Sequence, residues 1–150
     1  MPGSLDHSPA EVVRRLLIQE GLGSDPADPP GTWPVYANGE PDTPDSAITV
    51  YNTQGRDGGR TMTDGERQEH HGVQVRIRAA AFNTGFSKAR AIAVSMDEDI
   101  VQEFITIGSA SYKVWSISRS SDVLFLGNDT PTSKRKLFTI NALVSLRQVA

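Results

Sequence analysis

The stretch of sequence that decides the fold begins with SYKVWSISR, from Ser111 to Arg119. It continues through DVLFLG, the polar GNDTPTSKRK and KLFTINALVSLRQ, which ends at Gln148. In the last of these segments the residues of one parity are apolar: Phe138, Ile140, Ala142, Val144 and Leu146. A period of two is typical of a half-buried strand. These residues therefore predict a strand, a short apolar segment, a turn and a long final strand with one face on a core. The other parity, from Thr139 to Ser145, is polar apart from Leu143 and is available to solvent or to a partner.

Length and composition restrict the class of protein. A chain of 150 residues predicts a single domain over residues 1–150. The sequence has no cysteine, which excludes disulfides and thiolate metal sites. No apolar run approaches the roughly 20 residues of a membrane span, and MPGSLDHSP lacks the features of a signal peptide, so we expect the protein to reside in a reducing cytoplasm. The net charge of −3 gives no electrostatic reason to expect nucleic-acid binding.

Helices are predicted in two places. Ser8-Pro9-Ala10-Glu11 is a capping box with proline at the first helical position, and an apolar stripe follows it before Gly21 ends the helix. Asn83 or Thr84 is expected to cap a second helix, which ends near the acidic run at residues 97–99. The predicted apolar face of this second helix is Phe86, Ala89, Ile92, Ala93 and Met96.

Further strands are predicted between these helices. Residues 33–36 (WPVY) indicate a short edge strand, because Pro34 cannot donate to a central ladder. Residues 47–52 and 72–80 indicate two better strands, and residues 53–71 between them read as a long polar loop. Residues 100–107 fit either a helical extension or a strand. In the strand 72–80 one face is apolar, and the opposite face carries Gln74, Arg76 and Arg78.

The order of elements predicts an α+β fold: an antiparallel sheet with two helices packed on one face. The other face of the sheet would then be left for water or a neighbour. We expect Phe138, Ile140 and Val144 to pack beneath the second helix, and their expected partners there are Phe86, Ile92 and Met96.

No pattern in the sequence indicates catalysis or a bound cofactor. GRDGGR at residues 55–60 lacks the spacing and the lysine of a phosphate loop. His70 and His71 are adjacent and would point to opposite faces of an extended segment, so we predict no metal site there. There is no GxSxG, no HExxH and no recognisable nucleophile–base pair. Trp33 and Trp115 are interpreted as core or interface anchors.

A resemblance to a known family takes the interpretation further. The stretches that carry it are, in chain order, SPAEVVRRLLIQEGLG with the proline-rich segment and WPVY, then AITVYNTQGRDGG, HGVQVRIRAAAFNTGFSKARAIA and SYKVWSISRSSDVLFLGNDTPTSKRKLFTINALVSL. Through them the chain resembles the tail terminator or minor capsid (neck) proteins of long-tailed bacteriophages. The resemblance covers nearly the whole chain and is weakest over residues 97–109. No single motif is diagnostic, because such proteins have no active-site signature.

The resemblance implies a structural role in the virion. Proteins of this kind form a homo-hexameric ring on the last ring of tail tube subunits, stop polymerisation and offer the opposite surface to head-completion (connector) proteins. Genomic DNA passes through the lumen without its sequence being read. The resemblance further implies that the protein works by binding, with no catalysis, cofactor or membrane, in the virion tail or neck and in the host cytoplasm during assembly.

Subunit contacts are expected from the polar sheet face and from the segment 53–71, which we predict to be mobile in the free protein. The residues assigned to this interface are Arg56, Arg60, Asp64, Arg76, Arg78 and Asn141. Other readings stay open. The chain fits a head-completion or connector adaptor of the phage neck, which would differ in the partner that it binds. A small enzyme with an unrecognised site and a nucleic-acid-binding module also remain, the latter disfavoured by charge.

Overall fold

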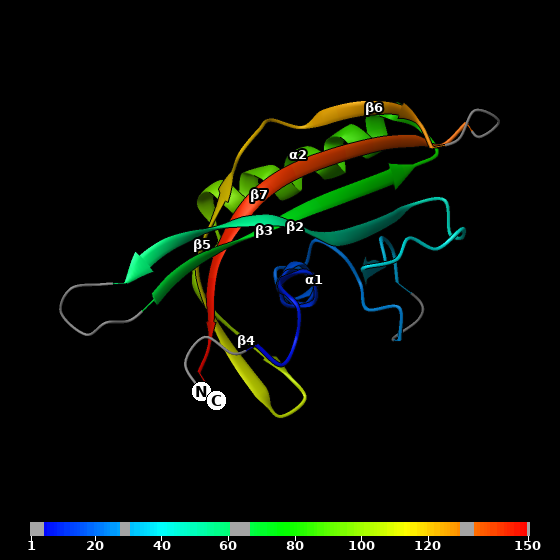
Figure 1. The fold of residues 1–150 in the computed structure, drawn as a ribbon. Helices are drawn as coiled ribbons and strands as arrows, with labels where there is room; N and C mark the ends of the chain where they lie inside the picture. Colours follow the sequence, from blue (N-terminus) through cyan, green and yellow to red (C-terminus); the bar gives the residue numbers. More distant parts are fainter. Residues whose placement is uncertain (1–4, 28–30, 61–66, 130–133, 150) are drawn as a thin grey trace.

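Figure 1 shows the fold in a computed structural model, which describes residues 5–27, 31–60, 67–129 and 134–149. The elements, in chain order, are α1 (Pro9–Gln19), β1 (Val35–Ala37), β2 (Ala47–Arg60), β3 (Arg67–Ala79), α2 (Phe82–Glu98), β4 (Val101–Ile107), β5 (Ala110–Arg119), β6 (Leu124–Asn128) and β7 (Lys136–Gln148). No helix in these ranges is long and apolar enough to cross a membrane.

The strands form one seven-stranded sheet in the order β1-β2-β3-β7-β5-β4, with β6 added beside β7. The central strand is β7, which pairs with β3 along one side and with β5 and then β6 along the other. All pairs are antiparallel except β1 with β2, which are parallel. The α+β prediction is therefore confirmed, and the sheet is mixed at its β1 edge. The predicted edge strand around Val35 is also confirmed.

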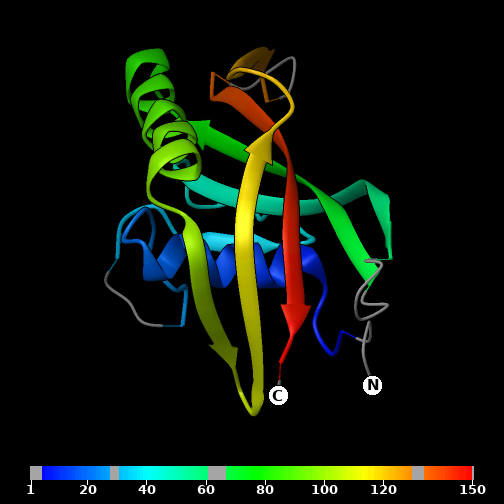
Figure 2. The ribbon, with the colours of Figure 1, turned by 90° about the vertical axis from the view of Figure 1, so that its left-hand side faces the viewer.

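Both helices pack on the apolar face of the sheet. In Figures 1 and 2 the sheet curls around α1, and α2 runs beside β7 and β5. The apolar residues of β7 that share one parity are all buried, as the alternation predicts. They belong to one hydrophobic core together with the inward residues of β2 and β3 and of both helices. A fully buried aliphatic side chain contributes about 1.5–3 kcal/mol, so this shared face holds the layers together.

The first helix forms as the sequence predicts. Ser8 caps it, with its Oγ accepting from the Glu11 backbone N–H at 3.4 Å, and Pro9 occupies the first turn. Gly21 follows the helix with a φ of 76°, the left-handed conformation that glycine adopts readily. Four residues of the predicted apolar stripe are buried: Val12, Val13, Leu16 and Leu17.

The second helix differs from the prediction at its start. It begins at Phe82, and its N-cap is Ala81, which makes no side-chain hydrogen bond, so the predicted caps at Asn83 and Thr84 are wrong. The physical reason is tertiary: the Phe82 ring packs edge-on against buried Phe138, with centroids 5.2 Å apart. The end near the acidic run is confirmed.

Gly85, rather than Phe86, faces the sheet in the first turns of α2. A Cβ on Gly85 would lie 2.6 Å from Cε2 of Phe138, so the helix approaches β7 closely there. Phe86 is left 44% exposed, and its ring centroid lies 6.3 Å from that of Phe138. The other predicted face residues of the helix are buried, as are Ile140 and Val144. The expected packing is therefore confirmed for Phe138 and corrected for Phe86.

The predicted loop over residues 53–71 is wrong within the described residues. β2 and β3 form a long hairpin whose register continues from Ala47↔Arg78 to Arg60↔Arg67, with irregularities after Thr53 and after Asp57. Antiparallel backbone hydrogen bonds need no apolar side chains, so a ribbon that is polar on both faces gives no sequence signal. Figure 1 shows this hairpin reaching beyond the helices. The segment 100–107, left open above, contains strand β4.

Candidate assembly surfaces

The outer face of β3 and β7 brings together part of the predicted interface. Gln74 and Asn141 are cross-strand partners, and Gln74 Nε2 donates to Asn141 Oδ1 at 3.2 Å. Arg76 lies on the same face, with its guanidinium 5.7 Å from the centroid of the Tyr51 ring. This surface is polar and half-exposed, so it can offer hydrogen bonds to a partner.

Arg78 is separated from that surface by the segment 38–46. It is buried, and its guanidinium donates to Glu40 Oε1 at 3.0 Å and to the backbone carbonyls of Pro44 and Asp45. Glu40 also lies 3.9 Å from Arg76 Nη1. In this arrangement Arg78 fastens the segment to the sheet and is not exposed to a neighbour.

A second arginine fastens the same segment. Arg135, just before β7, donates to the backbone carbonyl of Asp42 and forms ion pairs with Asp42 at 3.3 Å and Asp129 at 2.6 Å. The role of these acidic residues was not predicted from the sequence. A signal was present: Glu40, Asp42 and Asp45 stand close together in a proline-rich segment.

The hairpin carries the remaining predicted residues. Arg56 and Arg60 belong to β2 in the arm that projects from the body, and Asp64 lies outside the described residues. His70 and His71 pair with consecutive residues of β7, which places them on opposite faces as predicted. No group of three metal-type ligands occurs in the described ranges. In the backbone register Arg56 is the partner of His70 and Arg60 that of Arg67, whereas Asn141 is the partner of Gln74, further along β3.

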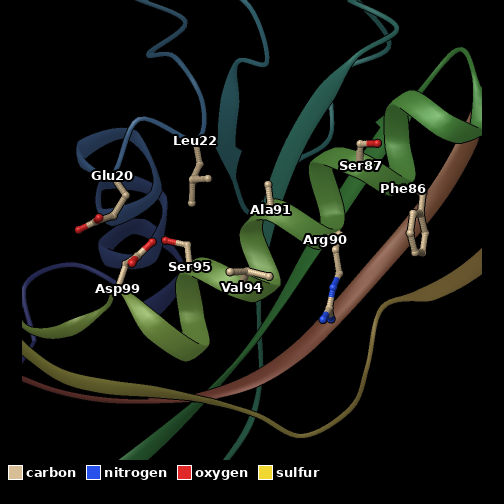
Figure 3. A pocket seen from close by; sticks show the side chains of 9 residues that line it. All are labelled: Glu20, Leu22, Phe86, Ser87, Arg90, Ala91, Val94, Ser95 and Asp99. Carbon is tan, nitrogen blue, oxygen red and sulfur yellow. The ribbon is translucent and has the colours of Figure 1, made fainter.

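A shallow groove of about 500 Å³ runs along α2 and meets the end of α1 (Figure 3). Glu20, Ser95 and Asp99 gather at one end, and Phe86 and Arg90 lie at the other. Burial, followed by repulsion from Glu103 and Asp99, raises the pKa of the Glu20 carboxyl. Figure 3 shows the Ser95 hydroxyl close to the Asp99 carboxylate, at the point where α2 ends. The lining is therefore partly polar and partly apolar, and the groove offers a surface for contacts.

An exposed apolar surface lies where α2 begins and β6 runs beside β7. We call it the β6 patch, and it comprises Phe82, Phe86, Leu124, Phe125 and Leu126, each 43–53% exposed. The rings of Phe82 and Phe125 lie 5.0 Å apart in an edge-on arrangement, and each lies 5.2 Å from the buried Phe138 ring. The phenylalanine rings of the patch contact one another, and Leu124 and Leu126 flank Phe125 along β6. Exposed apolar groups gathered in this way are typical of interaction sites.

A second exposed surface lies on β4, at the far edge of the sheet. Val101 and Phe104 are each 60% exposed. Lys113 of β5 lies 5.7 Å from the centroid of Phe104 and 5.4 Å from that of Trp115. Trp115, one of the predicted anchors, is half-buried on this outer face and is also contacted by Arg147 at 5.5 Å. Cations and aromatic rings thus alternate across β4, β5 and β7.

An ion pair joins the end of β5 to the end of α2. Arg119 donates to both carboxylate oxygens of Asp97, at 3.0 and 2.6 Å, and these hydrogen bonds lower the pKa of Asp97. A lowered carboxyl pKa adds stability above the unfolded value, and that stability is lost as the pH falls through the folded value.

Asp97→Asn is therefore expected to lower the melting temperature at neutral pH, and the difference from wild type should disappear in acid. The effect should stay below about 1 kcal/mol because Asp97 is partly exposed. Thermal melts from neutral to acid pH test it, with Glu98→Gln, at an exposed carboxylate of the same helix end, as the matched control. A difference that did not depend on pH would show that the ion pair contributes nothing.

The β6 patch was also missed from the sequence. DVLFLG contains consecutive apolar residues without polar alternation, which is unusual for a strand with one solvated face. That run was the available signal, but it is equally typical of a buried strand. The structure shows that these side chains remain about half exposed.

Comparisons with known proteins identify the family. No curated protein matches the chain. One matching solved structure is a chain of the "Virion of native gene transfer agent (GTA) particle", at 12% identity over 75% of this chain and 78% of that chain, with a TM-score of 0.43. That likeness is too weak to support an argument. Residues 16–146, which run from within α1 almost to the end of β7, match the family described as bacteriophage tail terminator protein. The chain belongs to the bacteriophage tail terminator family.

Proposed function

We propose that this protein closes into a hexameric ring that caps the phage tail tube and joins the tail to the head-completion complex. Its family membership makes it a structural protein of a phage tail, and the match over residues 16–146 is the observation that carries the proposal. In this role genomic DNA passes through the lumen without its sequence being read.

The surfaces of the molecule support a protein that works by binding. Its exposed features are an apolar patch, a polar sheet face and a projecting hairpin, and each of these can contact another protein. The interface residues that remain candidates are Arg56, Arg60, Arg76 and Asn141, while Arg78 supports the segment 38–46. A ring needs head-to-tail contacts whose rotation closes.

The test is a phage with an early stop codon in this gene, examined by electron microscopy of lysates. A cap is not needed for tube growth, so tails should grow beyond their normal length or remain unjoined beside full heads. Supplying the intact gene in trans is the control and should restore joined particles. Normal-length tails attached to heads would reject the proposal. Empty heads or absent tails would favour the head-completion adaptor or a tube component instead.

A further inference from the structure

We infer that the β6 patch of one copy binds the β4 edge of a second copy, in a head-to-tail contact. The inference rests on the proposed assembly of several copies and names the surfaces that join them. Figures 1 and 2 show β6 and β4 at opposite ends of the molecule, so one copy can use both at once.

The two strands are each open on one side. Within the described chain β6 pairs with β7 alone, and β4 pairs with β5 alone. The outer backbone groups of such strands are a template for a further strand. Each open strand also carries exposed apolar side chains, Leu126 on β6 and Val101 and Phe104 on β4 among them. A contact between the two edges would pair the open backbone groups of β6 with those of β4. The same contact would remove the exposed apolar side chains of both strands from water.

The carboxylates and ammonium groups that lack an ion-pair partner are distributed unevenly between the two edges. Near β4 lie Glu20, Asp99 and Glu103, which form no ion pair within the described residues. Burial is the main cause of the raised pKa of the Glu20 carboxyl, and repulsion from Glu103 and Asp99 adds to it. The outer face beside β4 also carries Lys113, which lies over the Phe104 ring.

Beside β6 lie exposed Lys134 and half-buried Lys136, and the Nζ of Lys136 donates to Asn128 Oδ1 at 2.9 Å. The two carboxylates that flank β6, Asp122 and Asp129, are already paired with Arg119 and Arg135.

This distribution selects the partner and the mode of contact. A β6–β6 contact would bring lysines together, and a β4–β4 contact would bring carboxylates together, so two-fold pairing is disfavoured by like charge. Pairing β6 with β4 places lysines near unpaired carboxylates. Because the chain supplies both complementary surfaces, the occupant is a second copy of this chain. Such heterologous contacts build rings when the rotation closes.

Single-cysteine variants test the contact directly, since the chain has no cysteine of its own. Leu126→Cys and Val101→Cys place one thiol at each proposed surface. Each purified full-length variant, and an equal mixture of the two, is treated with a short bismaleimide at high protein concentration. The same treatment is applied to tails assembled with both variants. Val149→Cys, also exposed and outside both surfaces, replaces Val101→Cys in the control mixture.

The Leu126→Cys and Val101→Cys mixture should give a cross-linked dimer, while either variant alone and the control mixture should not. Strong dimers from one variant alone would overturn the inference in favour of two-fold pairing. Equal dimers in the control mixture, or no dimers in solution and in tails, would also overturn it. A ring seen by microscopy without this cross-link would leave the proposed function standing and reject only these surfaces.

Discussion

Phe138→Ala is expected to lower the free energy of unfolding by about 3–5 kcal/mol, the usual cost of truncating a buried phenylalanine. The side chain is fully buried, and the rings of Phe82, Phe86 and Phe125 surround it. A Cβ on Gly85 would lie 2.6 Å from the Phe138 ring, so α2 already lies close to it, and Gly85 has no side chain that could turn into the cavity. Out of a typical total of about 5–15 kcal/mol, this loss would be large. Urea unfolding of the variant and the wild type measures this loss of free energy, provided that both proteins unfold with the same m-value.

Phe104→Ala is the matched control, because it removes the same atoms from a side chain that is 60% exposed. It should change the free energy of unfolding little. If both variants lost the same stability, the assignment of the two faces would be wrong. The Phe138 variant should also expose more apolar surface near the β6 patch, since the rings of Phe82 and Phe125 would lose their common support.

Glu40→Ala is expected to cost about 3 kcal/mol, the lower end of the 3–5 kcal/mol typical when one partner of a buried ion pair is removed. The Arg78 side chain is only 3% exposed. Without Glu40, the described partners of its guanidinium would be backbone carbonyls, those of Pro44 and Asp45. The lower end applies because those carbonyls remain. The segment 38–46 should then detach more readily from the sheet, which limited proteolysis would report alongside urea melts.

The double variant Glu40→Ala/Arg78→Met separates ion pairing from packing. Methionine keeps an apolar side chain at position 78 without a charge, so the double variant should be more stable than Glu40→Ala alone. Glu98→Ala, at the exposed end of α2, is the matched single control and should be close to wild type. A double variant less stable than Glu40→Ala would show that Arg78 stabilises the fold without Glu40.

The alternation of apolar residues explains which parts of the fold the sequence predicts. β3 and β7 each have one face on the core and one face outside, so burial leaves a period of two in the sequence. Ser8 and Gly21 predict the ends of α1 because capping is a local interaction. In these elements, local preference and tertiary packing agree.

The remaining features depend on contacts between residues far apart in the chain. The start of α2 is set by packing of Phe82 on Phe138, which overrides the local preference for a cap at Asn83. The β2–β3 hairpin is held by a backbone ladder that leaves no apolar pattern. Arg78 looked like an open interface residue because its partner, Glu40, lies 38 residues away. The exposure of β6 follows from its position beside β7, which no local rule contains.

The position of β7 at the centre of the sheet has a consequence for biosynthesis. Ribosomes make β7 after β3, β5 and β6, yet all of these strands pair with it. The β2–β3 hairpin is formed by neighbours along the chain and can pair early, but the other edge of β3 stays unpaired until residues 136–148 emerge. Folding dominated by such distant pairings is slow, and uncovered strands are prone to aggregate. A nascent chain that stalls before β7 would therefore leave the edges of β3, β5 and β6 unpaired and open to chaperones.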